Sequence, residues 1–303
     1  MLSTISTRLG FSSNGRAICW LVFGGTLFLF AITRLKYLDF YGTFCNREKK
    51  NALPGECFYF LRTSLEEIGM LVHLYCVIPA SILVWAQFVP SIRRRGLGVH
   101  RVNGRVCLAL GIVGAVAVIP NIRRAFGGDP AAQLANITLV GLFVMSSIKG
   151  YQSIKQHRVQ DHRAWMLRSW CYAGGIITVR IVMVLSAILI SMAGGYYIAQ
   201  PCDKIDHVLY GRNNTLSRYP GCAPFYTGEK LDQHVVVDAN LMNAKTDLMQ
   251  LVSAFNLGYP MSAWISLALH VLGPEVYLRM SQEDREPGKP ANNGKVKIGT
   301  KED

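Results

Sequence analysis

Charged residues are scarce in this chain. Only 17% of its 303 residues are Asp, Glu, Lys or Arg, and half are apolar, whereas about 25% of a typical globular chain is charged. This composition excludes an intrinsically disordered chain, which needs low hydrophobicity. Eight cysteines are also too few for a small protein that is held together mainly by disulfides.

Common signatures of catalysis and metal binding are missing as well. The sequence contains no Gly-rich nucleotide loop, no Ser-His-Asp context, no CxxC pair and no DDxxD-like pair of carboxylates. These motifs mark phosphate, nucleophile and metal sites because they place the required groups at short, fixed spacing. We therefore predict no metal site of these kinds.

Long apolar runs, in contrast, are abundant. A helix that spans a bilayer needs about 20 mostly apolar residues, and six such runs in one chain are improbable as buried helices of a soluble protein. The sequence predicts an all-α integral membrane protein with about six transmembrane helices. They are expected at residues 17–33, 69–90, 106–122, 131–148, 170–197 and 248–278.

The net charge of +13 is distributed unevenly along the chain. Cytoplasmic loops are enriched in Lys and Arg, so both termini and the two basic loops are expected in the cytoplasm, and the loops with nearly balanced charge on the other side. The charge then reflects topology and attraction to anionic lipid head groups, with no nucleic acid as partner. Residues 1–16, 91–105, 149–169 and the tail 279–303, disordered by composition, are inside; 34–68 and 198–247 are lumenal or extracellular.

Cysteine placement agrees with this topology. Four cysteines lie in the two outer loops, and the other four lie within or at the edges of the spans. Oxidising conditions on the outer side would produce this distribution. We predict the pairs Cys45–Cys57 and Cys202–Cys222, although pairing between the loops is equally allowed by counting.

The outer loop 198–247 also contains a glycosylation sequon at Asn213. Together with the cysteines, it favours a membrane of the secretory pathway, either the endoplasmic reticulum or the plasma membrane. We expect the first apolar run to remain as an uncleaved anchor, because no small-x-small cleavage pattern follows it.

Arg180 and four histidines are the candidate site residues. Arg180 lies about ten residues into the fifth span, roughly 15 Å from the inner surface, where a guanidinium is costly unless it faces a polar cavity or a partner. It is expected either to lock two helices together or to bind a carboxylate, propionate or phosphate. The partners available to it are Gln87, Tyr172, Asn256, His270 and Glu275; the histidines are His73 and His270 within spans and His100 and His162 near the inner face.

Two runs of residues near the inner face carry a resemblance to a known family. They are His100-Arg101-x-x-Gly104-Arg105 and His162-Arg163-x-Trp165-Met166-x-Arg168, the second followed by Arg180. With His73 and Gln87 before them, the chain resembles the predicted integral membrane proteins of the domain of unknown function 2306 family over roughly residues 66–278. Trp264 and Glu275 match more loosely, and 198–247 looks like an insertion. The resemblance implies an architecture and candidate residues but no reaction.

These residues leave three functions open. The first is electron transfer through haem b, because two histidines on neighbouring helices can ligate the iron while arginines pair with its propionates. An inner site would use His100 with His162, or His162 with His270. His73 lies near the outer face and has no histidine partner at its depth.

The second function is a membrane-embedded enzyme or carrier for a lipophilic prenyl or acyl substrate with an anionic head. Basic residues at the inner mouth would hold the head, and His100 or His162 would act as a catalytic acid or base. The third is a scaffold without catalytic activity, whose basic residues bind anionic lipid heads. Besides Arg180, the ligand-binding candidates are Gln87, Arg101, Arg105, Arg163 and Arg168.

Overall fold

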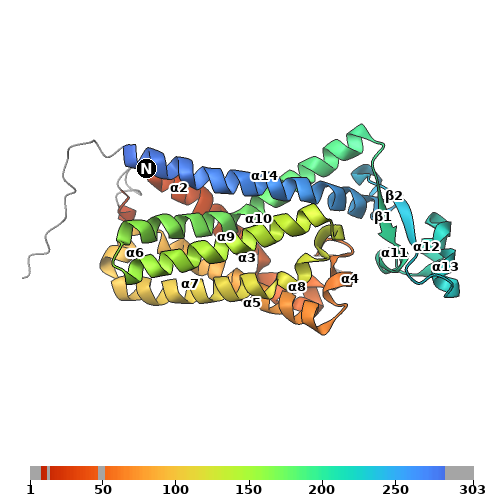
Figure 1. The fold of residues 1–303 in the computed structure, drawn as a ribbon, viewed down its shortest axis with the longest axis horizontal. Helices are drawn as coiled ribbons and strands as arrows, with labels where there is room; N and C mark the ends of the chain where they lie inside the picture. The colour runs from red at the N-terminus through yellow and green to blue at the C-terminus, as the bar shows by residue number, and fades with distance from the viewer. Residues whose placement is uncertain (1–7, 12–13, 47–51, 284–303) are drawn as a thin grey trace, which may run out of the picture.

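Long helices that run side by side form the body of the protein (Figure 1). The computed structural model describes residues 8–11, 14–46 and 52–283, so most of the expected tail 279–303 lies outside the described residues. Five helical segments are long and apolar enough to cross a membrane. They are Asn14–Leu38 (α2, Asn14–Cys19; η1, Trp20–Gly24; α3, Gly25–Arg34; η2, Leu35–Leu38), α5 (Ser64–Gln87), α7 (Leu97–Ala117), α9 (Pro130–Lys155) and α10 (Val159–Ala193).

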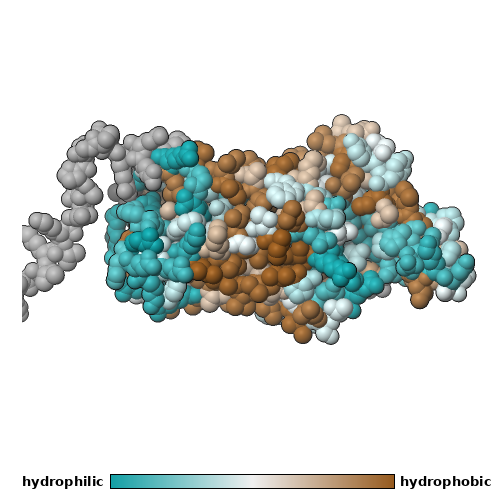
Figure 2. Space-filling model, in the orientation of Figure 1, coloured by the Kyte–Doolittle hydropathy of each residue, from teal (hydrophilic) through white to brown (hydrophobic). Residues whose placement is uncertain are grey.

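The surface of the bundle supports a membrane location. In Figure 2 a broad apolar band separates hydrophilic surfaces at the two ends of the molecule. Many large apolar side chains of the long helices are exposed, among them Val113, Leu189 and Leu269. Exposed apolar surface of this extent is unfavourable in water and favourable against lipid. The all-α membrane fold predicted from the sequence is confirmed.

The last helix, α14 (Leu248–Glu283), lies against α10 and α9 but is not among the five segments above. Its contact with α10 is made by small residues: Ser266 donates to the carbonyl oxygen of Gly175 over 2.8 Å, and Gly258 lies against Ser186. Small residues let membrane helices approach closely enough for such contacts. A sixth span at α14 stays a prediction.

The helices extend beyond the apolar runs at the inner end. The basic segment 91–105, expected as a loop, is mostly helical, because it contains α6 (Pro90–Arg95) and the first two turns of α7. Likewise α10 begins at Val159, eleven residues before the expected start of its span at 170. Apolar character limits the part of a helix that lipid can cover, whereas backbone hydrogen bonds continue into water.

At the outer end the helices stop earlier or break. The α10 helix ends at Ala193 instead of 197, because Gly194 and Gly195 adopt positive φ angles of 66° and 74°. After α7, residues Ile119–Ile122 form a separate short helix, α8, and Ala125–Gly127 form the 3-10 turn η4.

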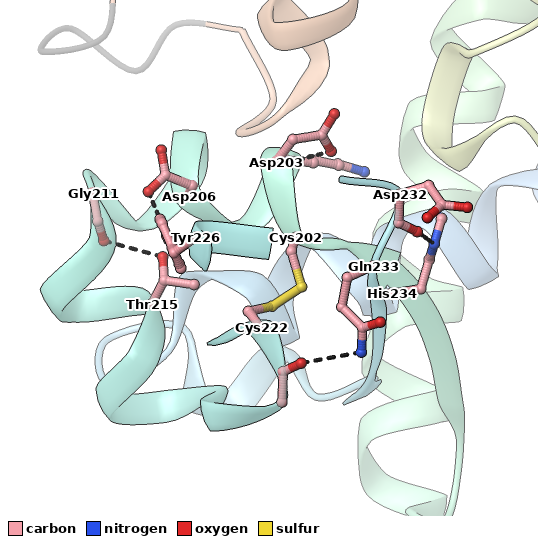
Figure 3. The surroundings of a disulfide bond; sticks show 12 residues. Cys202, Asp203, Asp206, Gly211, Thr215, Cys222, Tyr226, Asp232, Gln233 and His234 are labelled. Atoms are coloured by element: carbon pink, nitrogen blue, oxygen red, sulfur yellow. Dashed lines mark hydrogen bonds between the residues drawn. A yellow bond between two sulfur atoms is a disulfide. The ribbon is translucent and has the colours of Figure 1, made fainter. Parts of the chain in front are cut away.

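The outer loop 198–247 folds into a small unit. Strands β1 (Tyr197–Pro201) and β2 (His234–Asp238) pair antiparallel, with Tyr197 opposite Asp238. The helices are α11 (Cys202–Leu209), α12 (Arg212–Arg218), η5 (Pro220–Cys222), α13 (Ala223–Thr227) and η6 (Leu241–Asn243). Figure 3 shows the Cys202–Cys222 disulfide at its centre, with Tyr226 donating to Asp206 at 2.6 Å beside it. Asn213 is exposed on α12, and its glycosylation stays a prediction.

The first outer loop docks onto this unit. It contains the π-helical turn η3 (Phe40–Phe44) and α4 (Glu56–Phe60), which the Cys45–Cys57 disulfide joins. Arg62 forms an ion pair with Asp203 at 3.3 Å, connecting the two loops. Both disulfides therefore close within a loop, as predicted, and neither connects one loop to the other.

We expect loss of the second disulfide to destabilise the outer unit. Replacing Cys202 and Cys222 with Ala removes a closure over a sequence separation of 20 residues, which should lower the free energy of unfolding by about 3 kcal/mol. Thermal unfolding in detergent measures this effect, with the free Cys19→Ala as the control. A non-reducing digest that links Cys57 to Cys202 would contradict the pairing.

Candidate functional site

Two of the predicted histidines bridge helices. His73 of α5 places Nδ1 2.8 Å from the carbonyl oxygen of Gly114 in α7. His270 of α14 has both ring nitrogens engaged by α10, because Nε2 lies 2.8 Å from Thr178 Oγ1 and Nδ1 lies 2.6 Å from the carbonyl oxygen of Cys171. These contacts favour hydrogen bonding between helices over haem ligation for His270, which would have to break them.

His100 and His162 lie together at the inner end, as the sequence predicted for an inner site. His162 Nδ1 is 2.8 Å from the carbonyl oxygen of Gly150. With its amide turned to match its neighbours, Gln87 donates to His100 Nδ1 at 2.9 Å and accepts from Asn103 at 2.6 Å. Each imidazole is thus oriented through Nδ1, and His162 is within electrostatic range of His100.

Cations gather around this histidine pair. Burial among neighbouring side chains lowers the pKa of the Arg93 guanidinium, and the positive charges of Arg163 and Arg94 lower it further. Neither Arg93 nor Arg163 forms an ion pair with any residue in the described part of the chain. We call Arg93, His100, His162 and Arg163 the inner basic cluster.

The other inner arginines do not join this cluster. Arg101 and Arg105 are exposed on α7. Arg168 instead forms a bidentate ion pair between α10 and α14, with Nε 2.5 Å and Nη2 2.8 Å from the carboxylate oxygens of Glu275, and it lies over the ring of Trp165. Arg168 therefore connects two helices and leaves little capacity for a ligand.

In the described part of the chain, Arg180 forms no hydrogen bond or ion pair with any of the partners that the sequence suggested. Gln87 is engaged with His100, His270 with Thr178, and Glu275 with Arg168. Arg168 and Arg180 are twelve residues apart on one helix, so at about 100° per residue they point in directions about 120° apart. Depth in the span was predictable, but the direction in which Arg180 faces was not.

The actual surroundings of Arg180 come from other segments. Its guanidinium carbon lies 5.6 Å from the centroid of the Phe126 ring, and Tyr259, Arg34 and Glu56 are within electrostatic range. The Arg180 side chain is exposed, so it is accessible from outside the bundle. Within the described ranges it makes neither a hydrogen bond nor an ion pair.

Phe126 adopts a strained backbone conformation beside Arg180. Its φ angle is 50°, in the left-handed region that bulky residues rarely adopt. The ring stacks on Tyr259 with centroids 3.8 Å apart, and the Phe126 amide donates to Glu56 Oε2 at 3.1 Å. Strain of this kind persists only where surrounding contacts enforce it, and it is frequent at binding sites.

Two buried polar side chains beside Phe126 have atoms without hydrogen-bond partners in the described structure. Asn256 is 1% exposed, and neither its amide nitrogen nor its amide oxygen is hydrogen-bonded to a described residue. Glu56 is 2% exposed, and its Oε1 also has no partner there. Leaving a buried polar group unsatisfied costs about 1–3 kcal/mol. We call Glu56, Phe126, Arg180, Asn256 and Tyr259 the Arg180 cluster.

Most of the Arg180 cluster was absent from the sequence predictions. Asn256 appeared as a possible partner of Arg180, but Glu56, Phe126 and Tyr259 did not appear. Gly127-Gly128 signals a turn after Phe126, although nothing in the sequence places that turn against α14. Glu56 is one of several acids in an outer loop and carries no local signal at all.

The ion pair between Arg168 and Glu275 should stabilise the packing of α10 on α14. Glu275→Gln leaves Arg168 without a countercharge, and we expect a loss of about 1 kcal/mol because the pair is partly exposed. The melting temperature in detergent tests this. Asp161→Asn, which breaks an exposed pair with Arg158, is the matched control and should change little. The double variant Arg168→Glu with Glu275→Arg should recover part of the loss; no recovery would show that the charge pairing itself contributes little.

Known proteins are similar in sequence to large parts of this chain. Ava biosynthesis cluster protein G of Aspergillus versicolor is 23% identical over 316 residues, which cover 89% of this chain and 90% of that protein. No solved structure matches the chain. Residues 70–199, from α5 to β1, match the family model described as Predicted membrane protein (DUF2306). The resemblance to the domain of unknown function 2306 family, inferred from the two His-Arg runs, is therefore confirmed over residues 70–199.

Proposed function

We propose that this membrane protein binds a lipophilic small molecule through an anionic group that Arg180 holds within the bundle. The supporting observation is a guanidinium on a membrane-spanning helix that has no ion pair or hydrogen bond to described residues and lies over Phe126, whose neighbour Gly127 contacts the unsatisfied amide of Asn256. This is the second function predicted from the sequence, with the head group moved from the inner mouth to Arg180.

A second arginine supports an anion at this position. Arg34 of α3 is within electrostatic range of Arg180, and it is held in place by the Tyr37 hydroxyl at 2.8 Å. Two like charges in a poorly solvated site repel each other. A carboxylate or phosphate would relieve this repulsion, and a guanidinium can bind either through two parallel hydrogen bonds.

The walls around Arg180 suit a lipophilic molecule. Val179 and Met183 on α10 pack with Tyr259 in a buried apolar core, against which Phe126 also lies. On α10, Ile181 directly follows Arg180, Leu185 lies about one turn further along, and both side chains are exposed. Apolar walls with a few polar groups are typical of small-molecule sites, and the exposed flank would allow entry from the bilayer.

The relative in Aspergillus versicolor supports a role with small molecules. Its name places it in a biosynthesis cluster, and the alignment covers most of both chains. On this basis we propose that the bound molecule is a substrate or intermediate of biosynthesis, which this chain either carries or helps to convert.

The ligand should depend on Arg180. Protein purified in mild detergent is extracted with organic solvent, and the extract is analysed by mass spectrometry. We expect an acidic lipophilic compound in the wild type and at least tenfold less in Arg180→Gln, because the bidentate contact is lost. Arg123→Gln removes the same charge from an exposed position near the outer end and should retain the compound. Equal amounts in folded wild type and Arg180→Gln would refute the proposal.

A haem b site at the inner basic cluster is a second candidate function. The supporting observation is that His100 and His162 come from α7 and α10 and are each oriented through Nδ1. Ligating histidines commonly donate their Nδ1 proton to an oxygen, as His162 can to Gly150, whereas His100 accepts from Gln87 at Nδ1 and would have to change tautomer to ligate through Nε2. Arg93 and Arg163 would pair with the propionates, and a bound haem would supply one-electron chemistry. This proposal involves one haem, since His270 is engaged elsewhere and His73 has no histidine partner.

An absorption spectrum tests the haem site. Oxidised and dithionite-reduced protein should show a Soret band that His162→Ala removes, while His157→Ala, at an exposed turn, keeps it. No Soret band after expression with adequate haem supply would refute the site. If neither compound is found, the scaffold function remains.

We also propose the orientation predicted from the sequence. The basic clusters occupy one end of the bundle, and both disulfides occupy the other, which is consistent with a cytoplasmic inner end and an oxidising outer compartment. α14 would then be the sixth span, in a membrane of the endoplasmic reticulum or the cell surface. The exposed Arg101 and Arg105 would contact anionic lipid heads.

A further inference from the structure

The unsatisfied groups of the Arg180 cluster comprise both donors and acceptors. Arg180 offers only N–H donors, and Asn256 offers two more through Nδ2. Asn256 Oδ1 and Glu56 Oε1 are acceptors, and both are buried without a partner among the described residues. A simple anion supplies only acceptors, so it would satisfy Arg180 and the Asn256 nitrogen and leave both oxygens unpaired.

These groups surround one turn of the backbone. Glu56 holds the Phe126 amide through Oε2, and Arg180 lies over the Phe126 ring. The next residue, Gly127, is so close to Asn256 that an added Cβ would lie 3.0 Å from its Nδ2. Four segments, α4, η4, α10 and α14, thus bring the groups together around the Phe126–Gly127 turn.

The nearest cation does not satisfy Glu56. Lys204 of α11 is fully buried, but Nζ donates to Gln200 Oε1 at 3.2 Å and lies over the Tyr59 ring. Among the described residues it forms no ion pair with Glu56. Burial raises the pKa of the Glu56 carboxyl and lowers the pKa of the Lys204 ammonium to about 8.

We infer that the ligand of the Arg180 cluster is a hydroxy acid: a lipophilic molecule with a hydroxyl group near its anionic group. This inference rests on the proposed function at Arg180. The hydroxyl donates to Asn256 Oδ1 or Glu56 Oε1. Because a hydroxyl both donates and accepts, it pairs with Glu56 whether that carboxyl is ionised or protonated.

Asn256 is the specificity-determining residue in this arrangement. A site with a buried acceptor rejects an analogue that lacks the matching donor, because the acceptor then stays unpaired. The aromatic pair Phe126 and Tyr259 closes one side of the site without hydrogen-bonding capacity toward it, since the Tyr259 hydroxyl donates to Asn136 at 2.7 Å. Discrimination between acids therefore falls to Asn256 and Glu56.

The test compares hexadecanoic acid with 2-hydroxy- and 3-hydroxyhexadecanoic acid, each titrated into the full-length protein after removal of bound lipid. We expect at least one hydroxy acid to bind at least tenfold more tightly than hexadecanoic acid. Asn256→Leu, which preserves the side-chain shape, should abolish this preference and still bind hexadecanoic acid. Glu56→Leu, which removes the second acceptor, is a second variant and should reduce the preference. Asn103→Leu, at the opposite end of the bundle, is the control.

Each outcome decides between the two proposals. Equal binding of all three acids, lost in Arg180→Gln, refutes the hydroxyl and keeps the anion site. Binding that is the same in wild type and Arg180→Gln, or no binding of any acid, refutes both proposals. If Asn256→Leu does not fold, the wild-type protein decides: hydroxy acids that bind no more tightly than hexadecanoic acid overturn the hydroxyl.

Discussion

The structure depends on the requirement that a polar group inside a membrane must find its partner within the protein, because lipid offers none. Many polar groups of the bundle meet this requirement. His270 is hydrogen-bonded to α10 and His73 to α7, and Arg168 forms an ion pair with Glu275. These contacts also hold the helices in register, since each joins two of them. Polar side chains thus connect helices whose other surfaces are mostly apolar, both where they face each other and where they face lipid.

The Arg180 cluster is where this requirement is not met. A guanidinium, an amide and a carboxylate oxygen remain without partners in the described structure, around a strained turn and a stacked aromatic pair. Folding the chain this way is costly unless something else supplies the contacts. The two disulfide-bonded outer loops contribute to the site, because Glu56 reaches it from α4 next to Cys57. The insertion-like outer unit supports that loop through Arg62 and Asp203.

Much of the fold was predictable from the residues alone. Apolar runs of span length identified the membrane helices, and the cysteines in each outer loop paired with each other. Helix ends were less predictable. α7 begins within the basic segment. α10 ends just before Gly194, and the composition of the sequence does not reveal the positive φ angle of that glycine. Of the site, the proximity of His100 to His162 was expected, while the neighbours of Arg180 were not.

The sequence by itself determined that the chain lies in a membrane, which end is basic, and that one arginine lies deep in a span, because these properties depend on composition and on position along the chain. Only the tertiary structure decided which groups Arg180 meets. A helix rotates by about 100° per residue, and the turn at Phe126 and the loop with Glu56 are far from Arg180 in the chain. Their meeting depends on packing between segments, and that packing leaves a buried amide and a carboxylate oxygen unsatisfied beside a cation.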